Sequence, residues 1–131
     1  MLILIGGLPG AGKTTLAKML VHYYHSQNKD VVMLAADDYM IDDAGKYKFD
    51  PTKLEECHAQ CIADAFLCLE EGNIVIVHNT FSQNWEKKPY LEKAEQLNIP
   101  VQEILIKGPW ESVHGCSPIT IERMKNRWEY V

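Results

Sequence analysis

The feature that most constrains this chain is the segment GGLPGAGKTT at residues 6–15, which directly follows the apolar run MLILI. A continuous apolar run of this kind is typical of a strand that is buried on both faces of a sheet. The glycines permit a tight turn, and the residues after Thr14 have the apolar spacing of a helix. A buried strand, a glycine-rich turn and a helix in this order predict an α/β domain.

The turn also has a specific spacing. Four of its residues, Gly7, Gly12, Lys13 and Thr14, match the pattern G-x-x-x-x-G-K-[ST]. In such a loop, successive backbone N–H groups point at an anion, and the next helix adds the positive end of its dipole. We expect Lys13 to reach the outer phosphates of a nucleotide and the Thr14 hydroxyl to ligate Mg2+. The expected nucleotide-binding residues of the loop are Gly7, Leu8, Pro9, Gly10, Ala11, Gly12, Lys13, Thr14 and Thr15.

Strand and helix patterns alternate along the rest of the chain. Strands are predicted at 1–5, 31–35, 74–77 and 101–106, and helices at 14–26, 51–71, 84–97 and 118–130, with loops at 37–50 and 108–117. This alternation predicts a parallel sheet of four or five strands with helices on both faces, in a single domain that spans residues 1–131. Ligands of such sheets bind beyond the carboxyl ends of the strands, so reactive residues are expected directly after strands.

An acidic pair follows the second predicted strand. Asp37 and Asp38 lie in the stretch LAADDYM. A carboxylate at this edge can accept a proton from an attacking hydroxyl, and it can orient waters on a Mg2+ ion held by Thr14. The alternative is a capping or solvated pair at the start of a loop. We expect Asp37 to be both a general base and a metal ligand.

Polar residues also follow the third predicted strand, in the stretch VIVHNTF. Asn79 and Thr80 carry neutral groups that can hold a substrate oxygen, and His78 is a candidate second base, although a packed role is commoner for such a histidine. No Asp or Glu ends this strand, so the metal carboxylate is expected from Asp37.

The fourth predicted strand is followed by KGPWESVHGCSP, which we expect to form a short lid near 107–118. Phosphoryl transfer usually needs an arginine near the transferred group, and this segment has none. The chain has two arginines, Arg123 and Arg127, which lie four residues apart on the last predicted helix. Either they contact the nucleotide, or they form an exposed pair matched by Glu122 and Glu129.

Charge and composition exclude some classes of protein. A formal net charge of -5 argues against a protein that coats long stretches of nucleic acid, but leaves open a cleft for one nucleic acid end. The first apolar run is short and has no basic flank, so it predicts neither a signal peptide nor a membrane span. Cys57, Cys61 and Cys68 share one face of a predicted helix and read as core residues rather than metal ligands. We expect a reduced, cytoplasmic protein.

Several motifs together resemble a known family. The stretches GLPGAGKTT, ADDYM, DDAGKYKFDP, HNTF and IERMKNRWEY, in this order, resemble the P-loop kinase group of polynucleotide 5′-kinases and zeta toxins, an AAA-type ATP-binding family. Within that group, the chain is most similar to small proteins related to the kinase-like domain of NEDD4-binding protein 2. The resemblance implies a P-loop NTPase fold, a three-layer sandwich, and transfer of the γ-phosphoryl group of ATP to a hydroxyl with Mg2+. It also implies that Asp37 is the general base and that Lys13 and Thr14 bind the phosphates and the metal.

The chain departs from the polynucleotide kinases where the acceptor would bind. Met40 stands where they have an arginine that holds the acceptor's phosphate, and Asn79 stands where they have an acid. The expected acceptor-binding residues are Asp38, Met40, Asn79 and Thr80. The acceptor stays open between a nucleic acid 5′ end and a nucleoside or another small metabolite. A third alternative is a module that binds ATP as a switch with little transfer, because its lid lacks arginines.

Overall fold

The computed structural model describes residues 1–8, 11–40, 44–46, 48, 51–81 and 84–106. These residues form one parallel sheet and the helices that cover it. The strands are β1 (Leu2–Gly6), β2 (Val31–Leu34), β3 (Ile74–His78) and β4 (Val101–Leu105). The helices are α1 (Lys13–Ser26), α2 (Leu54–Glu70) and α3 (Asn84–Gln96), and two short 3-10 helices are η1 (Ala36–Tyr39) and η2 (Pro51–Lys53).

The strands have the order β2-β3-β1-β4, and all pairs are parallel. In the register, Ile5 of β1 lies opposite His78 of β3 and Ile104 of β4. The carboxyl ends of β2, β3 and β1 are therefore neighbours at one edge of the sheet. The segments that follow these three strands begin side by side.

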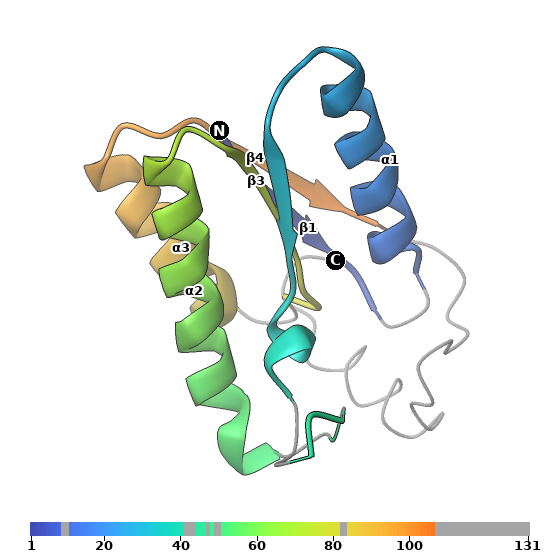
Figure 1. Ribbon diagram of the computed structural model, residues 1–131. Helices are drawn as coiled ribbons and strands as arrows, with labels where there is room; N and C mark the ends of the chain where they lie inside the picture. The colour runs from blue at the N-terminus through green and yellow to red at the C-terminus, as the bar shows by residue number, and fades with distance from the viewer. Residues whose placement is uncertain (9–10, 41–43, 47, 49–50, 82–83, 107–131) are drawn as a thin grey trace.

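The sheet lies between two helical layers, with α1 on one face and α2 and α3 on the other (Figure 1). Successive side chains of β1 point to opposite faces. Leu2 and Leu4 pack in the cluster that α2 and α3 cover, whereas Ile3 and Ile5 pack in the cluster that includes Ala17 of α1. Because both faces are covered, β1 is buried along its whole length, as its apolar sequence predicts.

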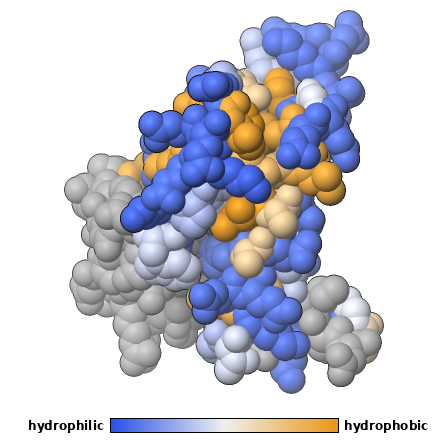
Figure 2. All heavy atoms as spheres, turned by 90° about the vertical axis from the view of Figure 1, so that its left-hand side faces the viewer, coloured by the Kyte–Doolittle hydropathy of each residue, from blue (hydrophilic) through white to orange (hydrophobic). Residues whose placement is uncertain are grey.

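Figure 2 views the molecule from the side of α2 and α3, where hydrophilic side chains surround patches of hydrophobic ones. Leu67 of α2 is 56% exposed and Leu97, just after α3, is 47% exposed. Among the described residues, no helix is both long and apolar enough to cross a lipid bilayer.

The predicted α/β class, the parallel sheet and the helices on both faces are confirmed, and the described part contains four strands. One local prediction is wrong. The segment after the second strand was expected to be loop from residue 37, but it begins with the 3-10 helix η1, which is too short to leave a periodic apolar pattern. The predicted last helix, at 118–130, lies outside the described residues.

Candidate functional site

The glycine-rich loop connects β1 to α1 at the edge where three strands end. The N–H of Gly7 donates a hydrogen bond of 3.2 Å to the Thr80 carbonyl, which ties the loop to the end of β3. A Cβ at Gly7 would lie 3.0 Å from the carbonyl oxygen of Ile106, so the backbone passes where a side chain does not fit. Gly12 has φ 103° directly before α1, a conformation that favours glycine. Lack of space at Gly7 and the backbone conformation at Gly12 therefore explain why the motif has glycine at both positions.

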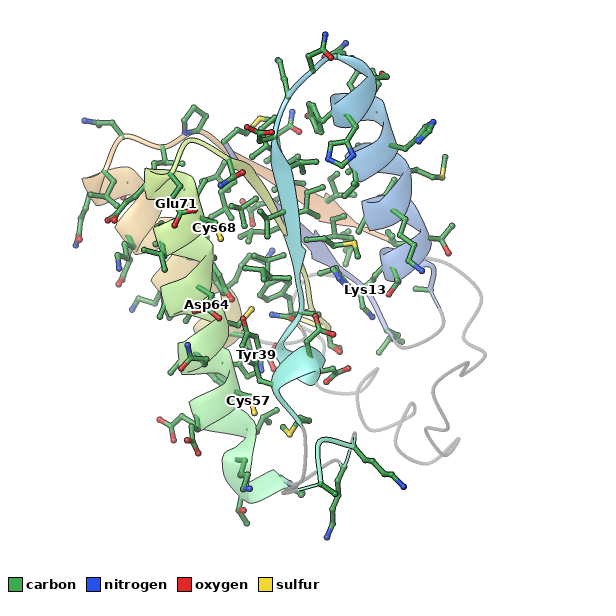
Figure 3. All side chains as sticks on the ribbon, in the orientation of Figure 1. Lys13, Tyr39, Cys57, Asp64, Cys68 and Glu71 are labelled. Carbon is green, nitrogen blue, oxygen red and sulfur yellow. The ribbon has the colours of Figure 1, made fainter. Side chains whose placement is uncertain are left out.

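Lys13 is the first residue of α1, and its side chain folds back over the loop (Figure 3). Its ammonium donates hydrogen bonds to the carbonyl oxygens of Gly7 at 2.7 Å and Leu8 at 3.1 Å. The Leu8 and Ala11 side chains are buried, so only backbone atoms of these two residues can face a ligand. The first turn of α1 contains no acidic residue, so its N-terminus keeps its positive potential.

Thr14 and Thr15 occupy the first turn of α1, where Thr14 is half-buried and Thr15 is exposed. Thr14 therefore lies in the turn of α1 that directly follows the loop. Pro9 and Gly10 lie outside the described residues, as do Arg123, Arg127 and the expected lid near 107–118.

The acidic pair lies on η1, which follows β2. Asp37 and Asp38 are both exposed, whereas Ala36 before them is buried. The turn is closed by hydrogen bonds from the Asp38 N–H to the Ala35 carbonyl and from the Met40 N–H to the Asp37 carbonyl, each 3.1 Å long. The two carboxylates are therefore held on an ordered turn and remain accessible from solvent.

Two side chains tie the end of η1 to α2 (Figure 3). The Tyr39 hydroxyl donates a hydrogen bond of 2.5 Å to Asp64, and the Cys57 thiol lies 3.5 Å from the Tyr39 carbonyl oxygen. Burial, with the Asp64 carboxylate as a second cause, raises the pKa of Tyr39, so its hydroxyl keeps the proton that it donates. The end of η1 is thus fixed against a second element.

Met40 does not fit the acceptor-binding role that its position suggested. Its side chain is 1% exposed, so it packs in the interior and offers no surface to an acceptor. Asn79 is also buried, at 5% exposure, and its Oδ1 atom already accepts a hydrogen bond from the Ala36 N–H. Thr80 is half-buried, with its carbonyl paired to the loop. Of the expected acceptor set, Asp38 is the exposed member.

His78 ends β3 and lies opposite Ile5 of β1 in the sheet. Burial lowers the pKa of its imidazole; the carboxylates of Asp38 and Asp37 act in the opposite direction, and the ammonium groups of Lys13 and Lys18 reinforce the lowering. The neutral imidazole therefore occupies the strand end that carries no carboxylate in this chain.

His58 of α2 is a site neighbour that the sequence did not reveal. Its ring packs edge-on against Trp85 of α3, with the ring centroids 5.7 Å apart. Burial lowers the pKa of His58, whereas the carboxylates of Glu86 and Asp37 act in the opposite direction. In the sequence it lies within a helix whose buried face is otherwise apolar, and no motif distinguishes it.

The described residues contain no group of three or more His, Cys, Asp or Glu side chains that could hold a metal ion. A site with few protein ligands is still typical of Mg2+, which keeps several waters and shares its coordination with substrate phosphates. Thr14 and Asp37 are consistent with such a site. Cys57 and Cys61 are buried in the interior, as expected of core residues.

The parallel sheet, the lysine-capped loop after β1 and the acidic turn after β2 define a P-loop protein of the kinase-like type. The model of the AAA domain family matches residues 2–115, and the chain belongs to this family. The similarity to NEDD4-binding protein 2 is confirmed: the human protein (Homo sapiens) is 31% identical over 141 aligned residues, which cover 98% of this chain. The chain spans only 8% of the length of that relative.

Two solved structures share the fold. Kti12 from Chaetomium thermophilum, in complex with ADP-AlF3, superposes with a TM-score of 0.73 at 16% identity, over 98% of this chain and 80% of that chain. The Mycobacterium tuberculosis APS kinase CysC, in complex with AMPPNP and APS, gives a TM-score of 0.69 at 16% identity, over 93% of this chain and 66% of that chain. Both comparisons establish the P-loop kinase-like fold.

Proposed function

We propose that this protein is an ATP- and Mg2+-dependent kinase that transfers the γ-phosphoryl group of ATP to a hydroxyl. The observation that carries the proposal is the pairing of two features at one edge of the sheet. One is the loop over which Lys13 folds, and the other is the exposed carboxylate of Asp37 on an anchored turn. The APS kinase with the same fold binds an ATP analogue together with its acceptor, which supports this class of reaction.

The residues present fit a bound nucleotide. Among the described residues, no atom lies within 4 Å of a Cβ built at Gly12, so this part of the loop adjoins open space. The α1 N-terminus and the loop N–H groups supply donors for phosphate oxygens. The Lys13 ammonium, held on two carbonyl oxygens 2.7 and 3.1 Å away, would exchange them for the outer phosphates. When bound, Mg2+ would neutralise charge on those phosphates, with Thr14 and Asp37 as its protein partners.

The proposed reaction assigns a proton to Asp37. A new bond joins the acceptor oxygen to the γ-phosphorus, while the bond from that phosphorus to the bridging oxygen of ADP breaks. The acceptor's proton passes to the Asp37 carboxylate, which is exposed and can meet a hydroxyl. Lys13 offsets the charge that builds on the phosphate oxygens.

A second candidate function is an ATP-binding switch with little transfer. The observation that favours it is His78, a neutral imidazole at the strand end where many P-loop enzymes place a metal-linked acid. The chain's two arginines, Arg123 and Arg127, remain in the proposal as nucleotide contacts, and the segment near 107–118 as a lid of one kinase-like domain. A cytoplasmic location is part of the same proposal, and the three cysteines that form no disulfide among the described residues suit it.

The test incubates the protein with γ-labelled ATP, Mg2+ and a panel of 5′-hydroxyl DNA, 5′-hydroxyl RNA and nucleosides. ATP affinity is measured separately by calorimetry. Asp37→Asn is expected to retain ATP binding and to lose at least 100-fold in kcat, because the base is removed. Lys13→Ala is expected to lose both. Asp30→Asn, which changes an exposed carboxylate at the opposite edge of the sheet, is the matched control.

The panel also separates the acceptors. Label on oligonucleotides favours a nucleic acid 5′ end, and label on nucleosides alone favours a small metabolite. ATP binding without label on any acceptor favours the switch. Transfer that Asp37→Asn leaves unchanged would exclude Asp37 as the base.

A further inference from the structure

Asn79 is a buried polar residue for which the proposed chemistry gives no direct role. It lies one residue beyond β3 and is 5% exposed. Its backbone N–H donates a hydrogen bond of 3.1 Å to the Ile5 carbonyl, so its backbone continues the β1–β3 pairing. This pairing with β1 fixes the backbone from which the Asn79 side chain extends. A buried amide at such a place needs partners, because an unpaired buried polar group is destabilising.

The Oδ1 atom of Asn79 accepts a hydrogen bond of 2.7 Å from the N–H of Ala36. The two residues are 43 positions apart in the sequence, and both are buried. Ala36 is the first residue of η1, so its N–H has no acceptor within that helix. The residue at the N-cap position is Ala35, which has no side-chain acceptor, and the turn has no cap of its own. Asn79 supplies this cap from the neighbouring strand.

The Asn79 amide nitrogen and the Tyr90 hydroxyl are two buried donors near each other. The Asn79 Nδ2 atom and the Tyr90 hydroxyl are both buried without a hydrogen-bond partner among the described residues. Cys61 lies beside both side chains, and burial raises the pKa of its thiol to about 11, so the thiol keeps its proton. An aspartate at position 79 would keep the acceptor for Ala36 and offer its second oxygen to the Tyr90 hydroxyl and the Cys61 thiol. This makes Asn79→Asp a conservative replacement for the contact with η1.

We infer that Asn79 is a positioning residue, which caps η1 across the sheet edge and so holds Asp37 in place. This inference rests on the proposed function, in which Asp37 is the base. Asn79 touches the residue next to Asp37, and at 5% exposure it does not itself meet an acceptor. The contact makes the geometry of the turn after β2 depend on the end of β3, which also carries the carbonyl that binds the phosphate loop.

The test compares three variants. Asn79→Leu has a similar size but no acceptor, and Asn79→Asp keeps the acceptor. Val77→Ala is the control, because Val77 is fully buried two residues earlier in β3 and belongs to the core cluster that α2 and α3 cover. It weakens the same part of the core without touching the Ala36 N–H. The first readout is amide hydrogen exchange at Ala36, Asp37 and Asp38, measured by NMR under conditions that equalise global stability.

We expect exchange at Ala36 to be at least tenfold faster in Asn79→Leu than in Val77→Ala, and Asn79→Asp to restore slow exchange. We also expect kcat to fall 10- to 100-fold in Asn79→Leu, with the Kd for ATP unchanged within threefold, because the base is misplaced while the loop is intact. Equal exchange at Ala36 in Asn79→Leu and Val77→Ala would overturn the inference. So would an unchanged kcat in Asn79→Leu, or a failure of Asn79→Asp to restore the protection.

Failure of the proposed function would look different. If the unmodified protein labels no acceptor, the kinase proposal fails, but the exchange at Ala36 still decides whether Asn79 caps the turn. If the protein is active, exchange and kcat must change together in Asn79→Leu.

Discussion

At the scale of single residues, the loop glycines can be tested against a matched glycine elsewhere. Gly12 has φ 103° and Gly72, after α2, has φ 92°, and a Cβ at either would meet no atom of the described part of the chain within 4 Å. Alanine at either position should lower the free energy of unfolding by about 1–2 kcal/mol, because an L side chain disfavours the left-handed conformation. Urea unfolding of Gly12→Ala and Gly72→Ala measures this effect.

The two variants should differ in ligand binding. The open space beside Gly12 is where we place the phosphates, so the added methyl group should weaken ATP binding at least tenfold. Gly72 is remote from the loop, and Gly72→Ala should bind ATP as the unmodified protein does. Equal ATP affinity of the two variants, measured by calorimetry, would show that Gly12 has only a backbone role.

A second prediction at this scale concerns pH. Burial lowers the pKa of His58 from its ordinary value of 6.5, so the folded protein binds fewer protons there than the unfolded chain. Stability therefore falls as the pH drops through 6.5, until the folded-state pKa is reached. The free energy of unfolding should be lower at pH 5.5 than at pH 7.5.

His58→Gln should reduce this pH dependence, because the buried titrating group is gone. Part of the dependence should remain, since burial also lowers the pKa of His78. His22→Gln, on the exposed side of α1, is the control. Urea unfolding at the two pH values gives the comparison, and an identical dependence in His58→Gln and His22→Gln would contradict the prediction.

The phosphate loop and the acidic pair could be predicted from single residues, because glycine, lysine and aspartate carry their chemistry in a fixed local spacing. The roles of Met40 and Asn79 could not. Met40 lies directly after η1 and Asn79 directly after β3, and both positions suggested contact with an acceptor. Whether these side chains are exposed depends on what packs over them. Met40 is 1% exposed, and Asn79 binds a backbone group that lies 43 residues away.

At the scale of elements, α3 contains an unfavourable residue. Pro89 lies inside this helix and is exposed. It has no N–H to pair with the carbonyl of Trp85, four residues earlier, and its ring crowds that turn. The sequence nevertheless predicts a helix at 84–97, and tertiary packing of Tyr90 and Ala94, both fully buried, accounts for its formation.

Pro89→Ala should raise the free energy of unfolding by about 1–3 kcal/mol, since alanine removes the crowding of the proline ring and has a much higher helix propensity. Glu95→Ala, at another exposed position of α3, should change it by less than about 0.5 kcal/mol. Urea unfolding of both variants is the measurement. A lower stability of Pro89→Ala would mean that the ring makes a contact that outweighs the lost hydrogen bond.

Strand boundaries were predictable where the sequence contains a continuous apolar run. The predicted strands at 1–5 and 74–77 differ from β1 and β3 by a residue at their ends. The turn η1 was missed because four residues leave no periodic signal and because its cap comes from another strand. Local sequence cannot contain a cap that tertiary structure supplies.

At the scale of the whole molecule, the strand order assembles the site. Loops that follow β2, β3 and β1 are separated by dozens of residues in the sequence, but the order β2-β3-β1-β4 makes them neighbours. The acidic turn, Asn79 and the phosphate loop therefore form one connected edge, joined by the hydrogen bonds from Ala36 to Asn79 and from Gly7 to Thr80. The sequence predicts a parallel sheet, but several strand orders are compatible with it.

This connection predicts that a nucleotide stabilises the fold as a whole. The loop is bonded to the end of β3, and α1, which begins at Lys13, covers one face of the sheet. A ligand that binds only the folded state at a hundred times its Kd adds about 2.7 kcal/mol. For a domain of this size, that corresponds to a rise in Tm on the order of 10 °C.

Thermal unfolding with and without ATP and Mg2+ measures this rise. Asp37→Asn should keep the shift, because it leaves the loop intact, whereas Lys13→Ala should lose it, because the loop then has no ammonium for the outer phosphates. A Tm that ATP and Mg2+ leave unchanged in the unmodified protein would contradict nucleotide binding by this edge of the sheet. An equal shift in Lys13→Ala would instead mean that the nucleotide binds at a different place, and the proposed role of the loop would fail with it.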